Sequence, residues 1–131
     1  MVTLPQKASE EAAKANPATP QRAMIDVVLD SLDDAKAENT VAIDITGKSS
    51  LSDHMVVTSG RSHRHVGAVA DQLMRALKDE GYGSPRVEGL PHCDWVLVDG
   101  GDVIVHIFRP EVREFYNIEK MWQAEFSDNP N

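Results

Sequence analysis

The sequence has few of the residues that stabilise secreted proteins or anchor membrane proteins. Cys93 is the one cysteine among 131 residues, which excludes an internal disulfide bond and favours a reducing compartment. No apolar run approaches the ~20 residues that span a bilayer. The N-terminal segment lacks the apolar core of a signal peptide. We therefore expect a cytoplasmic protein.

Basic residues are also few. The chain has 13 Lys and Arg against 21 Asp and Glu, a formal net charge of -8. Non-specific binding of nucleic acid relies on basic residues that replace counterions along the phosphates, so this balance argues against it. The acidity either suits a basic partner surface or only keeps the protein soluble.

The composition is that of a single globular domain, with 41% hydrophobic and 26% charged residues. Residues 1–19 are rich in Ala, Lys, Glu, Thr and Pro without an apolar period, so we expect a flexible N-terminal tail. Residues 20–126 are expected to form one α/β domain, and residues 127–131 a C-terminal tail.

Helical and strand patterns alternate along this domain. Apolar residues at helical spacing predict a helix from Arg22 to about Asn39. Ser62 is expected to cap a second helix, which stops at "EGYGSP" and has an apolar stripe of Val66, Val69, Ala70, Leu73 and Leu77. Strands are predicted in "TVAIDI", in "HMVVTSG" and around residues 85–88. This order predicts a mixed β-sheet flanked by helices.

The segment "HCDWVLVDGGDVIVHIFRP" predicts a hairpin with two unlike faces. A two-residue Gly-Gly turn would place Asp99 opposite Asp102 and Trp95 opposite His106. Valines then share one face, which we interpret as core, and the other face carries Trp95, Leu97, Asp99, Asp102, Ile104 and His106. Opposed aspartates cost a few tenths of a kcal/mol, so they either flank a solvated turn or face a basic partner.

A short helix is predicted to begin at Pro110, where the missing N–H costs nothing. Its apolar stripe, expected to pack on the sheet, comprises Val112, Phe115, Ile118 and Trp122. Tyr116, Glu119 and Lys120 are expected to lie to one side of it.

Known catalytic and metal-binding patterns are incomplete. "GKSSLSDHMVV" is similar to the nucleotidyltransferase signature, in which two carboxylates one residue apart hold a metal. Asp53 could be the first carboxylate, but Met55 occupies the second position and cannot bind Mg²⁺. His63 and His65 project about 200° apart on a helix. We expect no catalytic site, metal or cofactor, and the alternative is a diverged nucleotidyltransferase-like enzyme or nucleotide-binding protein that uses Asp53.

Three ordered motifs resemble the ribosomal silencing factor family, also called Iojap. They are "AIDITGKSSLSDHMVVTSGRSHRHVGAVAD", then "VEG" with "DWVLVDGGDVIVHIF", and "FYNIEKMW", together within residues 22–124. The resemblance implies a nucleotidyltransferase-like fold without the catalytic carboxylates, and a protein that is not an enzyme. The long N-terminal extension departs from the family pattern.

The same resemblance implies binding to the large ribosomal subunit through ribosomal protein uL14. Such binding would block association with the small subunit and repress translation under nutrient limitation, and family members are commonly homodimers. Carried over by motif, the partner-binding residues would be Glu88, Trp95, Asp99, Tyr116, Glu119, Lys120 and Trp122. Trp95 and Asp99 are among the residues that have no core role in the predicted hairpin.

Overall fold

The structure is a computed structural model that describes residues 22–50 and 52–120. The expected N-terminal tail, the expected C-terminal tail and Trp122 lie outside the described residues. The described elements follow in the order α1 (Met24–Asp34), β2 (Glu38–Asp44), β3 (His54–Ser59), α2 (His63–Asp79), β4 (Arg86–Glu88), β5 (Trp95–Asp99), β6 (Val103–Phe108) and α3 (Pro110–Tyr116).

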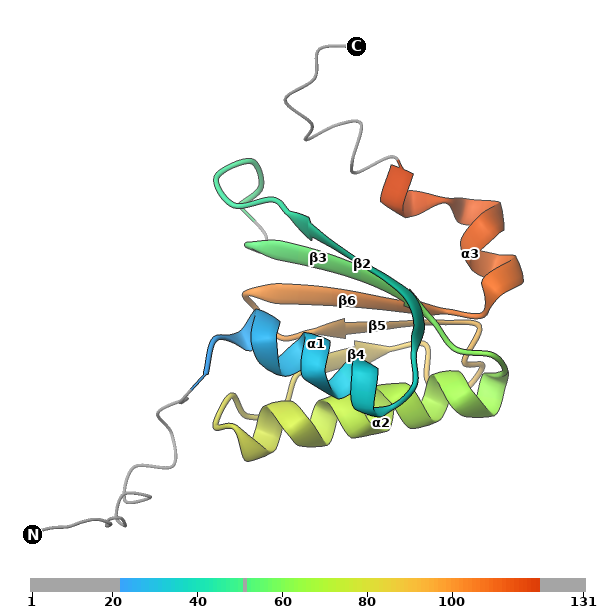
Figure 1. Cartoon of the computed structure of the whole chain (residues 1–131), viewed down its shortest axis with the longest axis horizontal. Coiled ribbons are helices and arrows are strands. Elements are labelled where there is room, and N and C mark those ends of the chain that lie inside the picture. The colour runs from blue at the N-terminus through green and yellow to red at the C-terminus, as the bar shows by residue number, and fades with distance from the viewer. Residues whose placement is uncertain (1–21, 51, 121–131) are drawn as a thin grey trace, which may run out of the picture.

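The strands form a five-stranded sheet with the order β2-β3-β6-β5-β4. The central pair, β3 and β6, is parallel and the other neighbours are antiparallel. Helices α1 and α2 lie together against one face of the sheet, whereas α3 follows the end of β6 on the other side (Figure 1). The predicted α/β class with a mixed sheet is confirmed.

Helix α1 ends at Asp34, well before the predicted end near Asn39. Lys36 adopts a left-handed φ of 65°, and the N–H of Ala37 donates to the carbonyl oxygen of Leu32 at 2.9 Å. This is the hydrogen bond that closes a Schellman motif. The predicted boundary was wrong because Ala and Lys favour helices locally, whereas the pairing of the next residues with β3 requires an extended chain.

Helix α2 agrees with its prediction. The hydroxyl of Ser62 accepts a hydrogen bond from the backbone N–H of His65 at 3.1 Å, which caps the helix. Gly81 follows the helix end with a φ of 101°. All members of the predicted stripe are buried: Val66, Val69, Ala70, Leu73 and Leu77.

The turn of the hairpin is wider than predicted. Asp99 pairs with Ile104 and not with Asp102. Oδ1 of Asp99 accepts a hydrogen bond from the N–H of Gly101 at 2.9 Å, so the carboxylate stabilises a turn that includes Asp102. The predicted opposition of two aspartates was therefore wrong, because a local bond from a side chain to the backbone favours the longer turn.

The resulting shift of register is two residues, which preserves the two faces because side chains alternate with a period of two. Trp95 consequently pairs with Phe108, and its predicted pairing with His106 was wrong. The valine face is confirmed as core, since it packs against α1 and α2 through the buried residues Val96, Val98, Val103 and Val105.

A second apolar cluster lies on the opposite face of the sheet. Its buried members are Ile43, Ile45, Met55, Val57, Phe108 and Ile118, with Val41, Trp95 and Val112 packed against them. Trp95 therefore lies at the margin of this second core and is half-buried.

Helix α3 is shorter than the predicted apolar stripe requires. It ends at Tyr116, and Asn117 follows in the left-handed region with a φ of 53°. The stripe assumed one continuous helix, and this break changes the direction of the residues that follow. Val112 and Ile118 pack on the second cluster as predicted, but Phe115 is 80% exposed and its predicted packing was wrong.

Candidate functional site

The candidate site lies on the sheet face opposite α1 and α2, over β4, β5 and β6. We call it the Trp95 face. The register pairs Arg86 with Asp99 and Glu88 with Leu97, which places these residues on the same face as Trp95. The face comprises Arg86, Glu88, Trp95, Leu97, Asp99, Ile104, His106 and Phe108.

Trp95 contacts other aromatic rings from two elements. Its ring centroid lies 4.9 Å from that of Phe108 on β6 and 4.9 Å from that of Tyr116 on α3. Tyr116 remains 50% exposed. The structure therefore brings together Trp95 and Tyr116, two of the expected partner-binding residues, although they are far apart in the sequence.

The indole of Trp95 is also held by a hydrogen bond. Its Nε1–H donates to Nδ1 of His106 at 3.0 Å. His106 is only 8% exposed, and this burial lowers the pKa of its imidazole to about 4. The ring is therefore neutral at pH 7, with its proton on Nε2. His106 is not among the partner-binding residues that the family motifs imply. A histidine beside a Trp in an otherwise apolar strand is the sequence signal that could have indicated it.

A shallow hollow lies beside Trp95. It has a volume of about 290 Å³ and is lined by Glu88, Gly89, Trp95 and Leu97. Gly89 has a φ of 92°, and a Cβ atom there would lie 2.2 Å from the carbonyl oxygen of Trp95. The loop after β4 can approach β5 this closely only because residue 89 is glycine.

The two expected carboxylates of the Trp95 face differ in their contacts. Asp99 is half-buried and its Oδ1 binds the turn at Gly101. Glu88 has a 64% exposed side chain and forms an ion pair with the exposed Arg86 at 3.6 Å. Such an exposed pair contributes little to stability, so the carboxylate of Glu88 remains accessible to a partner.

The remaining expected residues lie beyond α3. Both carboxylate oxygens of Glu119 bind the guanidinium of Arg113, at 2.6 and 3.0 Å. Glu119 thus has a shielded internal partner, whereas the ion pair of Glu88 with Arg86 is exposed. Lys120 is exposed at the end of the described chain.

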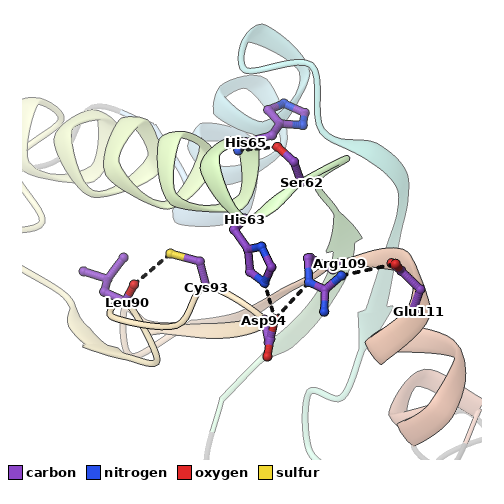
Figure 2. A network of polar contacts seen from close by, with 8 residues as sticks. All are labelled: Ser62, His63, His65, Leu90, Cys93, Asp94, Arg109 and Glu111. Atoms are coloured by element: carbon purple, nitrogen blue, oxygen red, sulfur yellow. Dashed lines mark hydrogen bonds and ion pairs between the residues drawn. The ribbon is translucent and has the colours of Figure 1, made fainter.

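A polar network fixes the loop between Glu88 and Trp95 (Figure 2). Oδ1 of Asp94 accepts hydrogen bonds from Nε2 of His63 at 2.7 Å and from Nε of Arg109 at 2.9 Å. The bonds from Arg109 and then His63 hold the pKa of the Asp94 carboxyl below its ordinary value. The network joins the start of α2, this loop and the residue that follows β6. It therefore holds the chain directly before Trp95 in place.

The histidines singled out in the sequence have structural partners. His65 accepts a hydrogen bond from the N–H of Arg61 at its Nδ1 and donates from its Nε2 to the carbonyl oxygen of Ala35, both at 2.9 Å. The thiol of Cys93 donates to the carbonyl oxygen of Leu90 at 2.7 Å. Within residues 22–50 and 52–120, no three His, Cys, Asp or Glu side chains are grouped so that they could hold a metal ion.

The positions that resemble a nucleotidyltransferase signature lie just before and at the start of β3, beside the turn of the hairpin. Asp53 is exposed, and its main chain bonds to Ile45 and to Asp102. Met55 is 2% exposed and belongs to the second apolar cluster. The second carboxylate position of the signature is therefore part of the core. In the described part of the chain, none of the helices is long and apolar enough to cross a membrane.

Comparison with known proteins agrees with this architecture. A family model described as "Ribosomal silencing factor during starvation" matches residues 17–131. The ribosomal silencing factor RsfS of Zymomonas mobilis is 51% identical over 109 residues, which are 82% of this chain and 81% of the relative. The mouse "Mitochondrial assembly of ribosomal large subunit protein 1" is 31% identical over 108 residues, 80% of this chain and 47% of that protein.

Solved structures show the same likeness. A crystal structure of a Chromobacterium violaceum protein has a TM-score of 0.74 and 34% identity, and the match covers 82% of this chain and 88% of that one. A crystal structure from Bacillus halodurans has a TM-score of 0.69 and 36% identity, covering 76% and 92%. By sequence and by fold, this chain belongs to the ribosomal silencing factor family.

Proposed function

We propose that this protein binds the large ribosomal subunit through ribosomal protein uL14 and uses the Trp95 face to do so. Its presence there blocks association with the small subunit and represses translation under nutrient limitation. Membership in the family supports this proposal. The observation that carries it is the Trp95–Tyr116 pair, which is half-exposed on a sheet face that α1 and α2 do not cover.

The aromatic pair has the properties of an interface anchor. Trp and Tyr are enriched among residues that contribute most to binding between proteins. The indole of Trp95 is already oriented by Phe108, Tyr116 and the hydrogen bond to His106. A side chain that is held before binding loses less conformational entropy on binding. The hollow between Trp95 and Glu88 adds a place for a partner side chain.

The charges of the face suit a basic partner. Glu88 is accessible, Asp99 lies on the same face, and the whole chain has a net charge of -8. A ribosomal protein surface is usually basic, and complementary charge speeds encounter more than it deepens affinity. We further propose that Lys120 and Trp122 extend the contact, that the protein acts in the cytoplasm without catalysis or cofactor, and that it forms a homodimer.

Co-sedimentation with purified ribosomal subunits tests the proposal. The protein should pellet with large subunits and not with small subunits, and isolated uL14 should compete for it. Added before the subunits are mixed, it should lower the fraction of joined ribosomes on a sucrose gradient. Equal binding to both subunits, or binding that uL14 does not compete, would contradict the proposal.

A further inference from the structure

Arg113 makes the most extensive set of side-chain hydrogen bonds at the C-terminal end of the described chain. Its Nε and Nη2 bind the two carboxylate oxygens of Glu119 at 2.6 and 3.0 Å. Its Nη1 donates to the hydroxyl of Ser59, at the end of β3, at 2.8 Å. We call these three residues the Arg113 clamp.

The clamp is well shielded from water. The side chains of Arg113 and Glu119 are 14% and 18% exposed. In the pairs of Arg22 with Asp30, Arg75 with Asp71 and Arg109 with Asp94, at least one side chain is far more exposed. A two-pronged Arg–carboxylate contact fixes geometry as well as charge. Removing one member of a shielded pair leaves the other charge without its partner.

Helix α3 needs such a contact because its apolar packing is small. None of its residues is fully buried, and Phe115 is 80% exposed. The chain leaves the helix through Asn117, whose N–H donates to the carbonyl oxygen of Arg113 at 2.7 Å. Arg113 therefore ends α3 with its main chain and, with its side chain, holds the helical turn that begins at Ile118.

Tyr116 lies directly before this turn. Its ring is 4.9 Å from that of Trp95. Within residues 22–50 and 52–120, no hydrogen bond holds its hydroxyl. The position of the ring thus depends on where α3 ends and on how the following turn is held. The clamp connects that turn to β3 through Ser59, so it determines how Tyr116 meets Trp95.

We propose that Arg113 and Glu119 are positioning residues for the Trp95 face, and that Glu119 acts by holding Arg113 and not by touching the partner. This inference rests on the proposed function, because it assigns roles within the same partner-binding surface. It also changes the role expected for Glu119, whose carboxylate already has both oxygens bound and is neutralised within the chain. Direct attraction of a basic partner remains with Glu88 and Asp99.

A double-mutant cycle on large-subunit binding tests the inference. Arg113→Met and Glu119→Gln should each weaken binding about fivefold, and the double variant should bind like either single one, because residues of one ion pair do not act additively. Reversing the pair, with Arg113→Glu and Glu119→Arg together, should restore part of the affinity. The matched control is Arg75→Met, which removes an arginine from the exposed pair with Asp71 on α2 and should bind like the wild type.

Two further measurements separate positioning from direct contact and from simple loss of stability. The association rate of Glu119→Gln should keep the wild-type dependence on salt, whereas that of Glu88→Gln should become less dependent on it. The indole N–H resonance of Trp95, identified by its loss in Trp95→Phe, should shift in folded Arg113→Met and Glu119→Gln. It should stay in place in Arg75→Met, because lower stability alone does not move a folded-state resonance.

Different results would overturn different claims. If Glu119→Gln weakens binding and Arg113→Met does not, or if their effects multiply to about 25-fold, Glu119 touches the partner and the inference is wrong. If Trp95→Ala weakens binding but neither clamp variant does, the clamp has no positioning role and the proposed function stands. If Trp95→Ala binds like the wild type, the Trp95 face is not the interface and both proposals are overturned.

Discussion

Trp95 and His106 are not paired in the β5–β6 ladder, yet the indole N–H of Trp95 donates to Nδ1 of His106 at 3.0 Å. The contact is diagonal across the hairpin, within reach of an aromatic side chain. It requires a neutral imidazole, because a protonated ring has no acceptor. The burial that holds the pKa of His106 near 4 therefore also preserves the orientation of Trp95.

The first prediction concerns the pH dependence of stability. The folded-state pKa of His106, about 4, lies below the ordinary value of 6.5, so between these values the unfolded chain binds more protons. The stability from a neutral His106 is complete above pH 6.5 and is lost as the pH falls toward 4. The loss has an upper bound of about 3 kcal/mol. Urea unfolding at pH 7, 5.5 and 4.5 measures it.

His106→Gln is the control for that measurement, since its amide oxygen can accept the indole hydrogen bond and does not titrate. Carboxylates contribute equally to both proteins, so the difference between the two pH profiles isolates His106. Parallel profiles would show that His106 is not held neutral by burial. His106→Leu, which has no acceptor, should weaken large-subunit binding more than His106→Gln does.

The second prediction is that Trp95→Ala weakens binding to large subunits by roughly thirtyfold, as loss of an interface Trp can cost 2 kcal/mol or more. Stability should also fall, by about 2 kcal/mol, because Trp95 is half-buried against Phe108 and the second apolar cluster. Binding is therefore measured well below the melting midpoint and corrected for the folded fraction by circular dichroism. Normal binding by the folded fraction would assign Trp95 to the core alone.

The third prediction is that Asp99→Lys slows association with large subunits and makes it less dependent on salt. The change removes one attraction to a basic partner and adds a like-charge contact. It should also cost about 1 kcal/mol of stability, because Oδ1 of Asp99 accepts the Gly101 N–H bond. Stopped-flow association at low and moderate salt is the measurement.

Asp79→Lys is the matched control for this charge change. Asp79 is exposed at the end of α2, on the helix-covered side of the sheet, so the variant has the same net charge without altering the Trp95 face. Equal slowing of both variants would mean that only the total charge matters. Unchanged association of Asp99→Lys at low salt would mean that Asp99 does not meet the partner.

The fourth prediction compares two glycines with similar positive φ angles, Gly89 and Gly101. Gly89→Ala should destabilise the fold by more than 2 kcal/mol, because the new Cβ would lie 2.2 Å from the carbonyl oxygen of Trp95 and φ is 92°. Gly101→Ala, with a φ of 101° and open space around it, should cost only about 1 kcal/mol of strain. Chemical denaturation of both variants decides, and equal losses would show that the close approach at Gly89 is not required.

The sequence by itself determined the features that depend on local periodicity. The stripe of α2, its Ser62 cap and the valine face of the hairpin were predicted correctly, because each follows from side-chain spacing along one element. The two faces of the hairpin survived an error in its register, since a shift of two residues leaves the alternation unchanged. The family was also recognisable from the sequence, because its motifs are contiguous.

Tertiary structure decided the features that depend on contacts between distant residues. Helix α1 stops at Asp34 because the next segment pairs with β3, although its composition favours continuing the helix. From the sequence, Glu119 is expected to be a free acidic group. Only the tertiary structure shows that its carboxylate is bound by Arg113 and shielded from water. The proximity of Tyr116 to Trp95 likewise has no local signal, because it depends on the position at which α3 ends and on the clamp that anchors the following turn to β3.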